Sequence, residues 1–172
     1  MGKSSIASVL LILTLAGVSG VYAYPYSRTD SNVALALDWL RNQQQADGSM
    51  DSFAISSWAV MAIASSEEDP NNWRNGGSSV VEYLKINLGL LSSCSDYSRF
   101  LLSMVAARTD PQTITKDGLD IVTKLESFYD GTQFGDPSLI NDDYWAVMAL
   151  VSAGVYTSDT KIQNALSLIK AS

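Results

Sequence analysis

Nearly the same apolar septet occurs twice in this chain of 172 residues, as WAVMAIA at 58–64 and as WAVMALV at 145–151. An apolar run of seven residues is compatible with a buried strand or with part of a buried helix. Residues 53–66 contain no glycine or proline and are rich in alanine, which favours a helix. Because a helix that is apolar nearly all round belongs in the interior of a fold, the repeated septet predicts two equivalent buried helices.

A third and more divergent copy lies between these two, where residues 100–106 read FLLSMVA. An Asp-Pro pair follows the first and second copies, at Asp69-Pro70 and Asp110-Pro111. Amphipathic segments alternate with the apolar ones, at 33–45, 79–88, 119–129 and 162–170. Their equivalent leucines are spaced by 44, 41 and 43 positions and are Leu40, Leu84, Leu125 and Leu168. A period in the low forties, made of one amphipathic and one apolar helix, predicts a repeat of helical pairs.

Two stretches of the chain resemble repeats of the prenyltransferase and squalene oxidase type. The first is LDWLRNQQQADGSM followed by SSWAVMAIAS, and the second is LESFYDGTQFGDPSLINDDYWAVMALVSAG. Such repeats build the α/α toroid of terpenoid cyclases and protein prenyltransferases, with apolar helices in an inner ring and amphipathic helices in an outer ring. The resemblance implies an all-α fold over residues 32–172. About three and a half helix pairs would form a partial toroid, that is, an open arc of helical hairpins.

The first residues of the chain have the pattern of a secretory signal peptide. Lys3 is followed by the uncharged stretch IASVLLILTLAGVSG and then by the small-residue exit VYA, which ends at Ala23. We therefore expect residues 1–23 to be a cleavable signal peptide, residues 24–31 to be a linker, and the protein to be secreted or at the cell surface. The alternative is an uncleaved membrane anchor, for which Ile6 to Ala23 is at the short end.

The composition excludes several kinds of chemistry. The chain contains no histidine, which excludes Ser-His-Asp and Cys-His catalysis and the common zinc sites. Cys94 is the only cysteine, so an internal disulfide cannot form. The net charge of −7 disfavours nucleic acid as a partner, because an acidic domain repels phosphate backbones. We expect no metal and no cofactor.

The acidic run at 140–143 departs from the catalytic motifs of the family that the chain resembles. Class II terpene cyclases carry Asp-x-Asp-Asp, whereas this chain reads Ile140-Asn141-Asp142-Asp143. The class I pattern Asp-Asp-x-x-Asp fails because Ala146 stands at its fifth position. The run is better explained if Asn141 is a helix N-cap and the two acids interact with the positive end of the helix dipole.

Two other possibilities remain open for the acidic residues. A toroid-type glycosidase or lyase needs two carboxyls across a cleft, and the candidates are Asp47, Asp136, Asp142 and Asp143. A calcium site within residues 130–143 is conceivable, since calcium prefers oxygen ligands, although the spacing matches no known coordination scheme. Acidic residues beside glycine are also common in ordinary turns.

The sequence favours an exported binding or interaction domain that lacks the catalytic motifs of the family it resembles. The alternative is a truncated or degenerate terpenoid-cyclase-like enzyme acting on an isoprenoid or another apolar substrate. The expected partner is an apolar or sugar ligand, or another protein. We predict a ligand site formed by Gln133, Asp136, Asn141, Asp142, Asp143, Tyr144 and Trp145. Self-association through the C-terminal helix is also expected, because Ile162, Leu166 and Ile169 would lie on one face without a partner.

Overall fold

The computed structural model describes residues 29–172. The predicted signal peptide at 1–23, and most of the predicted linker at 24–31, lie outside the described residues. The described residues are mostly helical, as the sequence predicts, with seven α-helices and one two-stranded sheet. The helices are α2 (Ser31–Gln43), α3 (Phe53–Ser65), α4 (Val80–Ile86), α5 (Cys94–Ala106), α6 (Ile121–Glu126), α7 (Ile140–Ser152) and α8 (Thr160–Ala171).

The three apolar helices α3, α5 and α7 are structural repeats of one another. Each is 13 residues long. Two positions after the end of each helix, a residue has left-handed backbone, namely Glu67, Arg108 and Gly154. The same backbone hydrogen bond closes each end, from Glu68 N–H to Ile63 O, from Thr109 N–H to Met104 O, and from Val155 N–H to Leu150 O. This is the Schellman arrangement, which satisfies carbonyls that the helix end leaves free. The three apolar helices therefore end in the same way, although they begin 41 and 46 residues apart.

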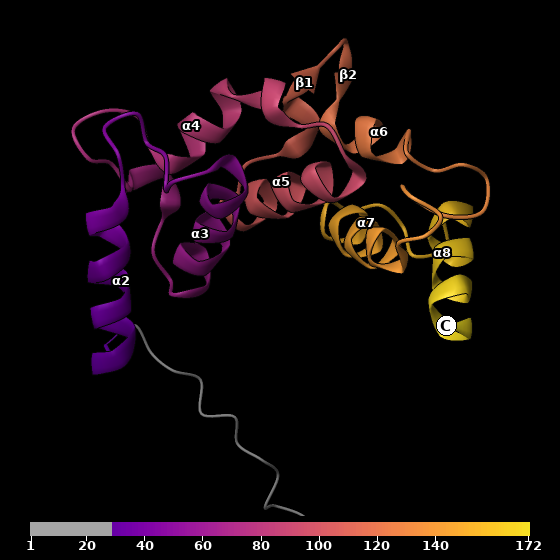
Figure 1. Ribbon diagram of the computed structural model, residues 1–172, viewed down its shortest axis with the longest axis horizontal. Helices are drawn as coiled ribbons and strands as arrows, with labels where there is room; N and C mark the ends of the chain where they lie inside the picture. Colours follow the sequence, from indigo (N-terminus) through magenta and orange to yellow (C-terminus); the bar gives the residue numbers. More distant parts are fainter. Residues whose placement is uncertain (1–28) are drawn as a thin grey trace, which may run out of the picture.

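The helices form a curved double layer (Figure 1). The inner row consists of α3, α5 and α7 side by side, with α5 packed against both neighbours. Helices α4 and α6 cover one side of this row, and α2 and α8 stand at its two ends (Figure 1). Helix α4 packs chiefly against α3, α6 against α5, and α8 against α7. Each of these three outer helices thus rests on the inner helix that precedes it in the chain.

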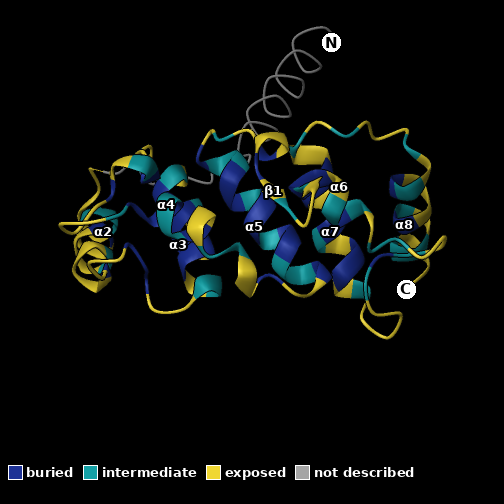
Figure 2. Ribbon diagram, turned by 90° about the horizontal axis from the view of Figure 1, so that it is seen from above, coloured by how far each residue is buried: buried dark blue, intermediate teal, exposed yellow. Residues whose placement is uncertain are grey.

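Buried residues, dark blue in Figure 2, lie on helices of both the inner row and the outer layer. Outer-layer side chains with no exposed surface include Leu84 on α4 and Leu125 on α6. Phe100 on α5 is also fully buried, and its ring stacks on that of Phe53 with centroids 6.0 Å apart. Burying a large apolar side chain stabilises a fold by about 1.5 to 3 kcal/mol, so these buried side chains hold the arc together.

The amphipathic segment predicted as a helix at 119–129 is only partly helical. Strands β1 (Thr115–Lys116) and β2 (Leu119–Asp120) pair as an antiparallel hairpin, and α6 covers only Ile121–Glu126. The turn is made by Asp117 and Gly118, which both have positive φ. An Asp-Gly pair suits such a turn because both central residues need left-handed backbone. The hairpin keeps Leu119 and Asp120 in a strand, so the helix begins only at Ile121.

Two assumed equivalences between repeats are wrong by a few residues. The inner helices begin at 53, 94 and 140, so the counterpart of Trp58 in the middle helix is Arg99 and not Phe100. Among the outer helices, Leu84 and Leu125 are fully buried, whereas Leu40 and Leu168 are only half-buried. The buried positions of the end helices are Leu37 on α2 and Ile162 and Ala165 on α8. The end helices contact fewer neighbours, so their leucines need not keep the register of the middle ones.

The apolar surface expected at the C-terminal helix is instead at the opposite end of the arc. On α8, Ile162 is fully buried and Leu166 packs against the core. On α2, Leu35 and Trp39 are 67% and 63% exposed, and Figure 2 shows this helix largely exposed or intermediate. No helix among residues 29–172 is long and apolar enough to cross a membrane.

Candidate functional site

One side of the inner row is left uncovered by the outer layer. At helix positions 2, 6, 9 and 13, no residue of α3, α5 or α7 is fully buried. The fully buried positions 4 and 11 lie about half a turn away, on the side that α4 and α6 cover. The twelve uncovered residues, here called the inner wall, are Ala54, Trp58, Met61 and Ser65, Ser95, Arg99, Leu102 and Ala106, and Asn141, Trp145, Met148 and Ser152.

The centre of the inner wall is a row of two tryptophans and one arginine. Trp58, Arg99 and Trp145 occupy the same position on three neighbouring helices. The rings of Trp58 and Trp145 meet edge to face, with centroids 5.3 Å apart and an interplanar angle of 71°. Arg99 comes from the helix between them, and its guanidinium lies 3.6 Å from the Asp96 carboxylate. An aromatic pair with a cation on the helix between its two members can bind flat apolar groups and anionic ones.

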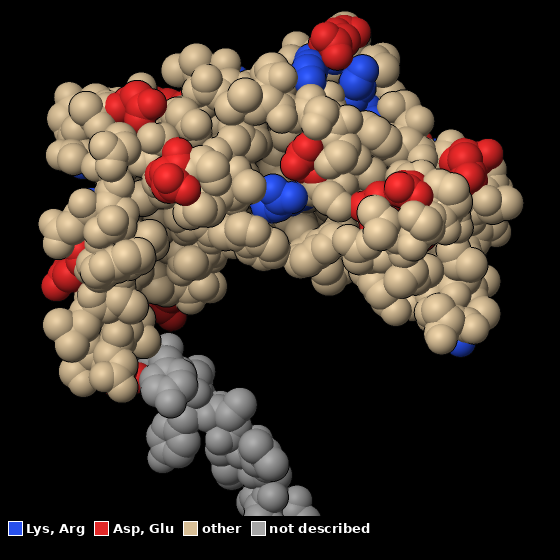
Figure 3. Space-filling view, in the orientation of Figure 1, with Lys and Arg blue, Asp and Glu red and all other residues tan. Residues whose placement is uncertain are grey.

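A second row, one turn further along, is apolar and adaptable. It consists of Met61, Leu102 and Met148, of which Met148 is 48% exposed. Methionine side chains fit irregular apolar shapes because they are unbranched and polarizable. Figure 3 shows the arch hollowed on the side between α2 and α8, with few charged side chains along the hollow. The inner wall is therefore a concave, mostly uncharged surface.

The seven predicted ligand-site residues separate into three groups. Asn141, Tyr144 and Trp145 lie on the uncovered side of α7, and Tyr144 is 42% exposed. Gln133 and Asp136 lie in the loop before α7, where the Asp136 carboxylate accepts hydrogen bonds from Ser138 N–H and Oγ–H, both at 2.8 Å. Asp142 and Asp143 are 6% and 1% exposed and face into the fold.

The predicted N-cap is wrong, whereas Asp142 and Asp143 do lie in the first turn of α7, as predicted. The N-cap of α7 is Leu139, whose side chain makes no capping hydrogen bond, and Asn141 is the second residue of the helix. The Asp142 carboxylate instead accepts hydrogen bonds from the Ser95 hydroxyl of α5 and from Asp136 N–H at 3.0 Å. A side chain at Gly135 would collide with this carboxylate. Asp142 therefore fastens the preceding loop and α5 to α7, which a surface cap could not do.

Asp143 holds the same loop from a neighbouring position. Its Oδ1 accepts the Phe134 N–H at 2.8 Å, and its Oδ2 is buried without a partner among the described residues. Burial raises the pKa of Asp143, and the negative charges of Asp142 and Asp130 raise it further, whereas the Phe134 N–H lowers it. Ser56, at the same helix position in α3, accepts the Met50 N–H at 2.8 Å in the corresponding loop. Asp143 and Ser56 thus play the same structural role, because each holds the loop that precedes its helix.

Cys94 lies beside this buried pair. Its thiol is 3.9 Å from the Asp142 carbonyl oxygen and is only 2% exposed. Burial and the nearby Asp142 charge raise the pKa of Cys94 to about 12. Because the thiolate is the reactive form of cysteine, this thiol is inert at neutral pH.

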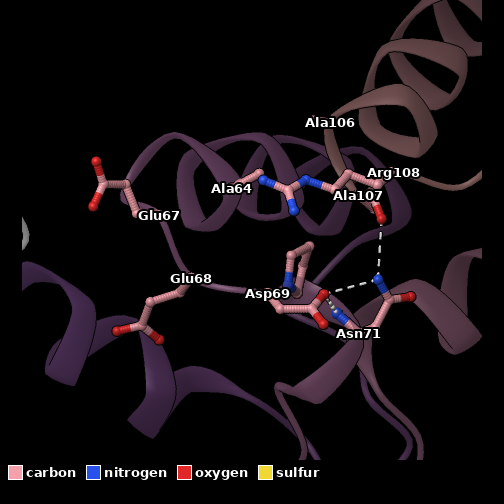
Figure 4. A pocket seen from close by; sticks show the side chains of 9 residues that line it. Ala64, Glu67, Glu68, Asp69, Asn71, Ala106, Ala107 and Arg108 are labelled. Atoms are coloured by element: carbon pink, nitrogen blue, oxygen red, sulfur yellow. Dashed lines mark hydrogen bonds between the residues drawn. The ribbon is translucent and has the colours of Figure 1, made fainter.

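A second concavity, of about 550 Å³, lies between the carboxyl ends of α3 and α5 (Figure 4). Its lining is polar and includes Glu67, Asp69, Asn71 and Arg108. Asp69 accepts hydrogen bonds from Asn71 N–H at 3.0 Å and Asn71 Nδ2–H at 2.8 Å, which lower its pKa. These bonds also order the turn η1 (Pro70–Asn72). The described residues contain no group of three or more side chains suited to hold a metal ion.

Sequence reasoning missed Arg99, Met61 and Leu102 as wall residues. The signal that would have identified them is the common start of the three inner helices, which places Arg99 in line with the two tryptophans. A register taken from apolar letters alone aligns Phe100 there. No family model, curated protein or solved structure matches this chain. The assignment of a site therefore depends on the geometry of the inner wall.

Proposed function

We propose that this protein is an exported binding module whose inner wall binds an apolar ligand, with Trp58 and Trp145 as its main contacts. The observation that carries the proposal is the meeting of these two rings on the uncovered face of the inner row, 5.3 Å apart. Large aromatic side chains left half-exposed at the centre of a concave surface are typical of binding sites.

The repeat order of the helices supports a relation to the prenyltransferase and squalene oxidase repeats. In such a chain the inner and outer helices would form part of an α/α toroid, and the inner wall would correspond to the side that faces its central space. The proposal of export depends on the N-terminal sequence pattern and on the single inert cysteine.

Catalysis is the less favoured alternative. Asp142 and Asp143, the acids that resemble a cyclase motif, lie behind the inner wall and hold the 130–139 loop. Asp47 and Asp136 accept hydrogen bonds from the serines two residues later, Ser49 and Ser138. Each of these four carboxylates thus accepts a hydrogen bond from a loop residue, and none of them belongs to the inner wall.

A fluorescent anionic aromatic dye such as anilinonaphthalene sulfonate tests the proposal directly. It combines apolar rings with a sulfonate, which suits a surface that has both tryptophan rings and Arg99. We expect Trp58→Ala and Trp145→Ala to weaken binding to residues 24–172 about tenfold each. The matched control is Trp39→Ala, which removes an exposed tryptophan from α2 and leaves the inner wall intact.

Competition then identifies the ligand class. Displacement of the dye by farnesol or a fatty acid would indicate a chain-like apolar ligand, and displacement by oligosaccharides would indicate a sugar. Equal dye binding by the parent protein and both wall variants, with loss of binding only in Trp39→Ala, would contradict the proposed site.

A further inference from the structure

Arg99 is the only charged residue of the inner wall. It holds the sixth position of α5, where the neighbouring helices carry Trp58 and Trp145. A charged side chain beside apolar ones loses part of its hydration, and a partner of opposite charge offsets this cost. A single cation at the centre of an otherwise uncharged wall therefore points to the charge of the ligand.

The ion pair that Arg99 makes within the chain is a long one. Its Nη2 lies 3.6 Å from Asp96 Oδ1, which exceeds the length of a hydrogen bond. Arg74, by comparison, donates hydrogen bonds from both Nη atoms to Glu82. Asp96 is itself held by the start of its helix, because its Oδ2 accepts the Ser93 N–H at 3.1 Å. Since a guanidinium has five N–H donors, Arg99 can pair with a second carboxylate while Asp96 keeps it in position.

Partial burial of Arg99 strengthens such a pair. The side chain of Arg99 is 19% exposed, whereas that of Arg74 is 44% exposed. Water and salt screen an ion pair less where its charges are partly covered. The planar guanidinium fork also matches the two oxygens of a carboxylate. The wall therefore favours an anionic head group, and a carboxylate in particular.

An apolar strip continues from Arg99 toward the carboxyl end of α5. It consists of wall residues that are apolar and either flexible or small, namely Leu102 and Ala106 on α5, Met61 on α3 and Met148 on α7. From the sixth to the thirteenth helix position, the strip is about 10 Å long. Methionine side chains adapt to irregular apolar shapes, so the strip suits a flexible hydrocarbon chain.

We propose that the ligand of the inner wall is a single-chain amphiphile with one carboxylate, of the fatty-acid type. Its head pairs with Arg99, and its chain lies over Leu102 between the two methionines. This inference rests on the proposed function, because it assigns the ligand class of the same wall. A head with two or more negative charges fits less well, since Arg99 is the only cation of the wall and the Asp96 carboxylate lies 3.6 Å from it.

Two ligands that differ only in the head group test the inference. Decanoate and 1-decanol carry the same chain, and their binding to the purified protein is measured by titration calorimetry at pH 8. We expect decanoate to bind about tenfold more tightly, because the ion pair adds to the same chain contacts. High salt should reduce this preference, since it screens the pair.

Substitutions at Arg99 then locate the head group. Arg99→Gln should abolish the preference for decanoate and leave the affinity for 1-decanol unchanged. Arg99→Lys should keep part of the preference, because lysine retains the charge and loses the planar fork. The matched control is Lys85→Gln, which removes an exposed positive charge from α4, on the covered side of the inner row, and should keep the full preference.

The outcomes separate this inference from the proposed function. Equal binding of decanoate and 1-decanol by the parent, or a preference that survives Arg99→Gln, would overturn the inference and leave the apolar site in place. Failure of the parent to bind either ligand would overturn both. Circular dichroism checks the fold of each variant. Where Arg99→Gln does not fold, the parent decides at low and high salt, and a preference that salt leaves unchanged counts against the ion pair.

Discussion

Trp58 and Trp145 lie in edge-to-face contact although α5 stands between the helices that carry them. The contact is possible because the inner row curves, which brings equivalent side chains on its open side toward each other. The repeated septet therefore does more than specify two similar helices. Its first residue in each copy forms part of one shared surface.

We predict that these two tryptophans are coupled in stability. Because both rings keep some exposed surface, Trp58→Ala and Trp145→Ala should each cost about 1 to 2 kcal/mol of unfolding free energy. Aromatic pairs contribute about 0.5 to 1.5 kcal/mol beyond their buried area, so the double variant should cost less than the two single costs added together. A double-mutant cycle by urea unfolding measures this difference. Additive costs would mean that the ring contact contributes nothing.

The buried Asp143 should make stability depend on pH in an unusual direction. Its folded-state pKa is raised, so its contribution is fully present below the unfolded pKa and is lost as the pH rises through the folded value. Asp143→Asn keeps an oxygen for the Phe134 N–H and removes the buried charge. We expect this variant to be more stable than the parent at pH 7, with a gain that disappears near pH 3.

Asp142→Asn is the matched control for that experiment. Both oxygens of Asp142 accept hydrogen bonds. An amide in its place would turn these charge-assisted bonds into weaker neutral ones, with its oxygen accepting the Asp136 N–H and its NH2 donating to the Ser95 hydroxyl oxygen. We expect this variant to lose about 1 to 3 kcal/mol at pH 7. Thermal unfolding at pH 3 and pH 7 separates the two cases, and equal behaviour of both variants would contradict the assigned roles.

The left-handed end of α3 offers a stabilising substitution. Glu67 has φ of 65°, whereas the corresponding residue of α7 is Gly154 with φ of 93°. Side chains beyond glycine are strained in this region. Glu67→Gly should therefore raise the unfolding free energy by about 0.5 kcal/mol, and Gly154→Ala should lower it by about 1 kcal/mol. Denaturant midpoints provide the comparison, and a loss of stability in Glu67→Gly would show that its side chain makes a contact of greater weight.

Glu82 should remain charged to unusually low pH. Its carboxylate pairs with Arg74 and also accepts the Ser79 N–H at 2.9 Å, which lowers its pKa to about 2. Its contribution is therefore present above the unfolded pKa and is lost as the pH falls through about 2. Titration of the side chain by NMR checks this value. A midpoint near 4 in the parent, or no upward shift in Arg74→Gln, would mean that the pair does not form in solution.

The sequence predicted the kind and order of the helices because each apolar run is long, rich in helix formers and bounded by breakers. It failed where a side chain serves a neighbouring loop. Asp142 and Asp143 have the composition of a helix start, yet their burial depends on Gly135 and Phe134, whose proximity arises only in the folded chain. The role of Arg99 was equally hidden, because a charge in an apolar run does not reveal that it is aligned with two tryptophans on other helices.

Helices α2 and α8 are the first and last described members of the outer layer. In the repeat order, α2 takes the outer position before α3, and α8 takes the outer position that follows α7. A second molecule added at the α7 end in repeat register would bring its own α2 into the volume that α8 already fills. Growth of this protein into an open filament by simple head-to-tail stacking is thereby blocked on steric grounds. Any assembly of copies must use another face or displace a terminal helix.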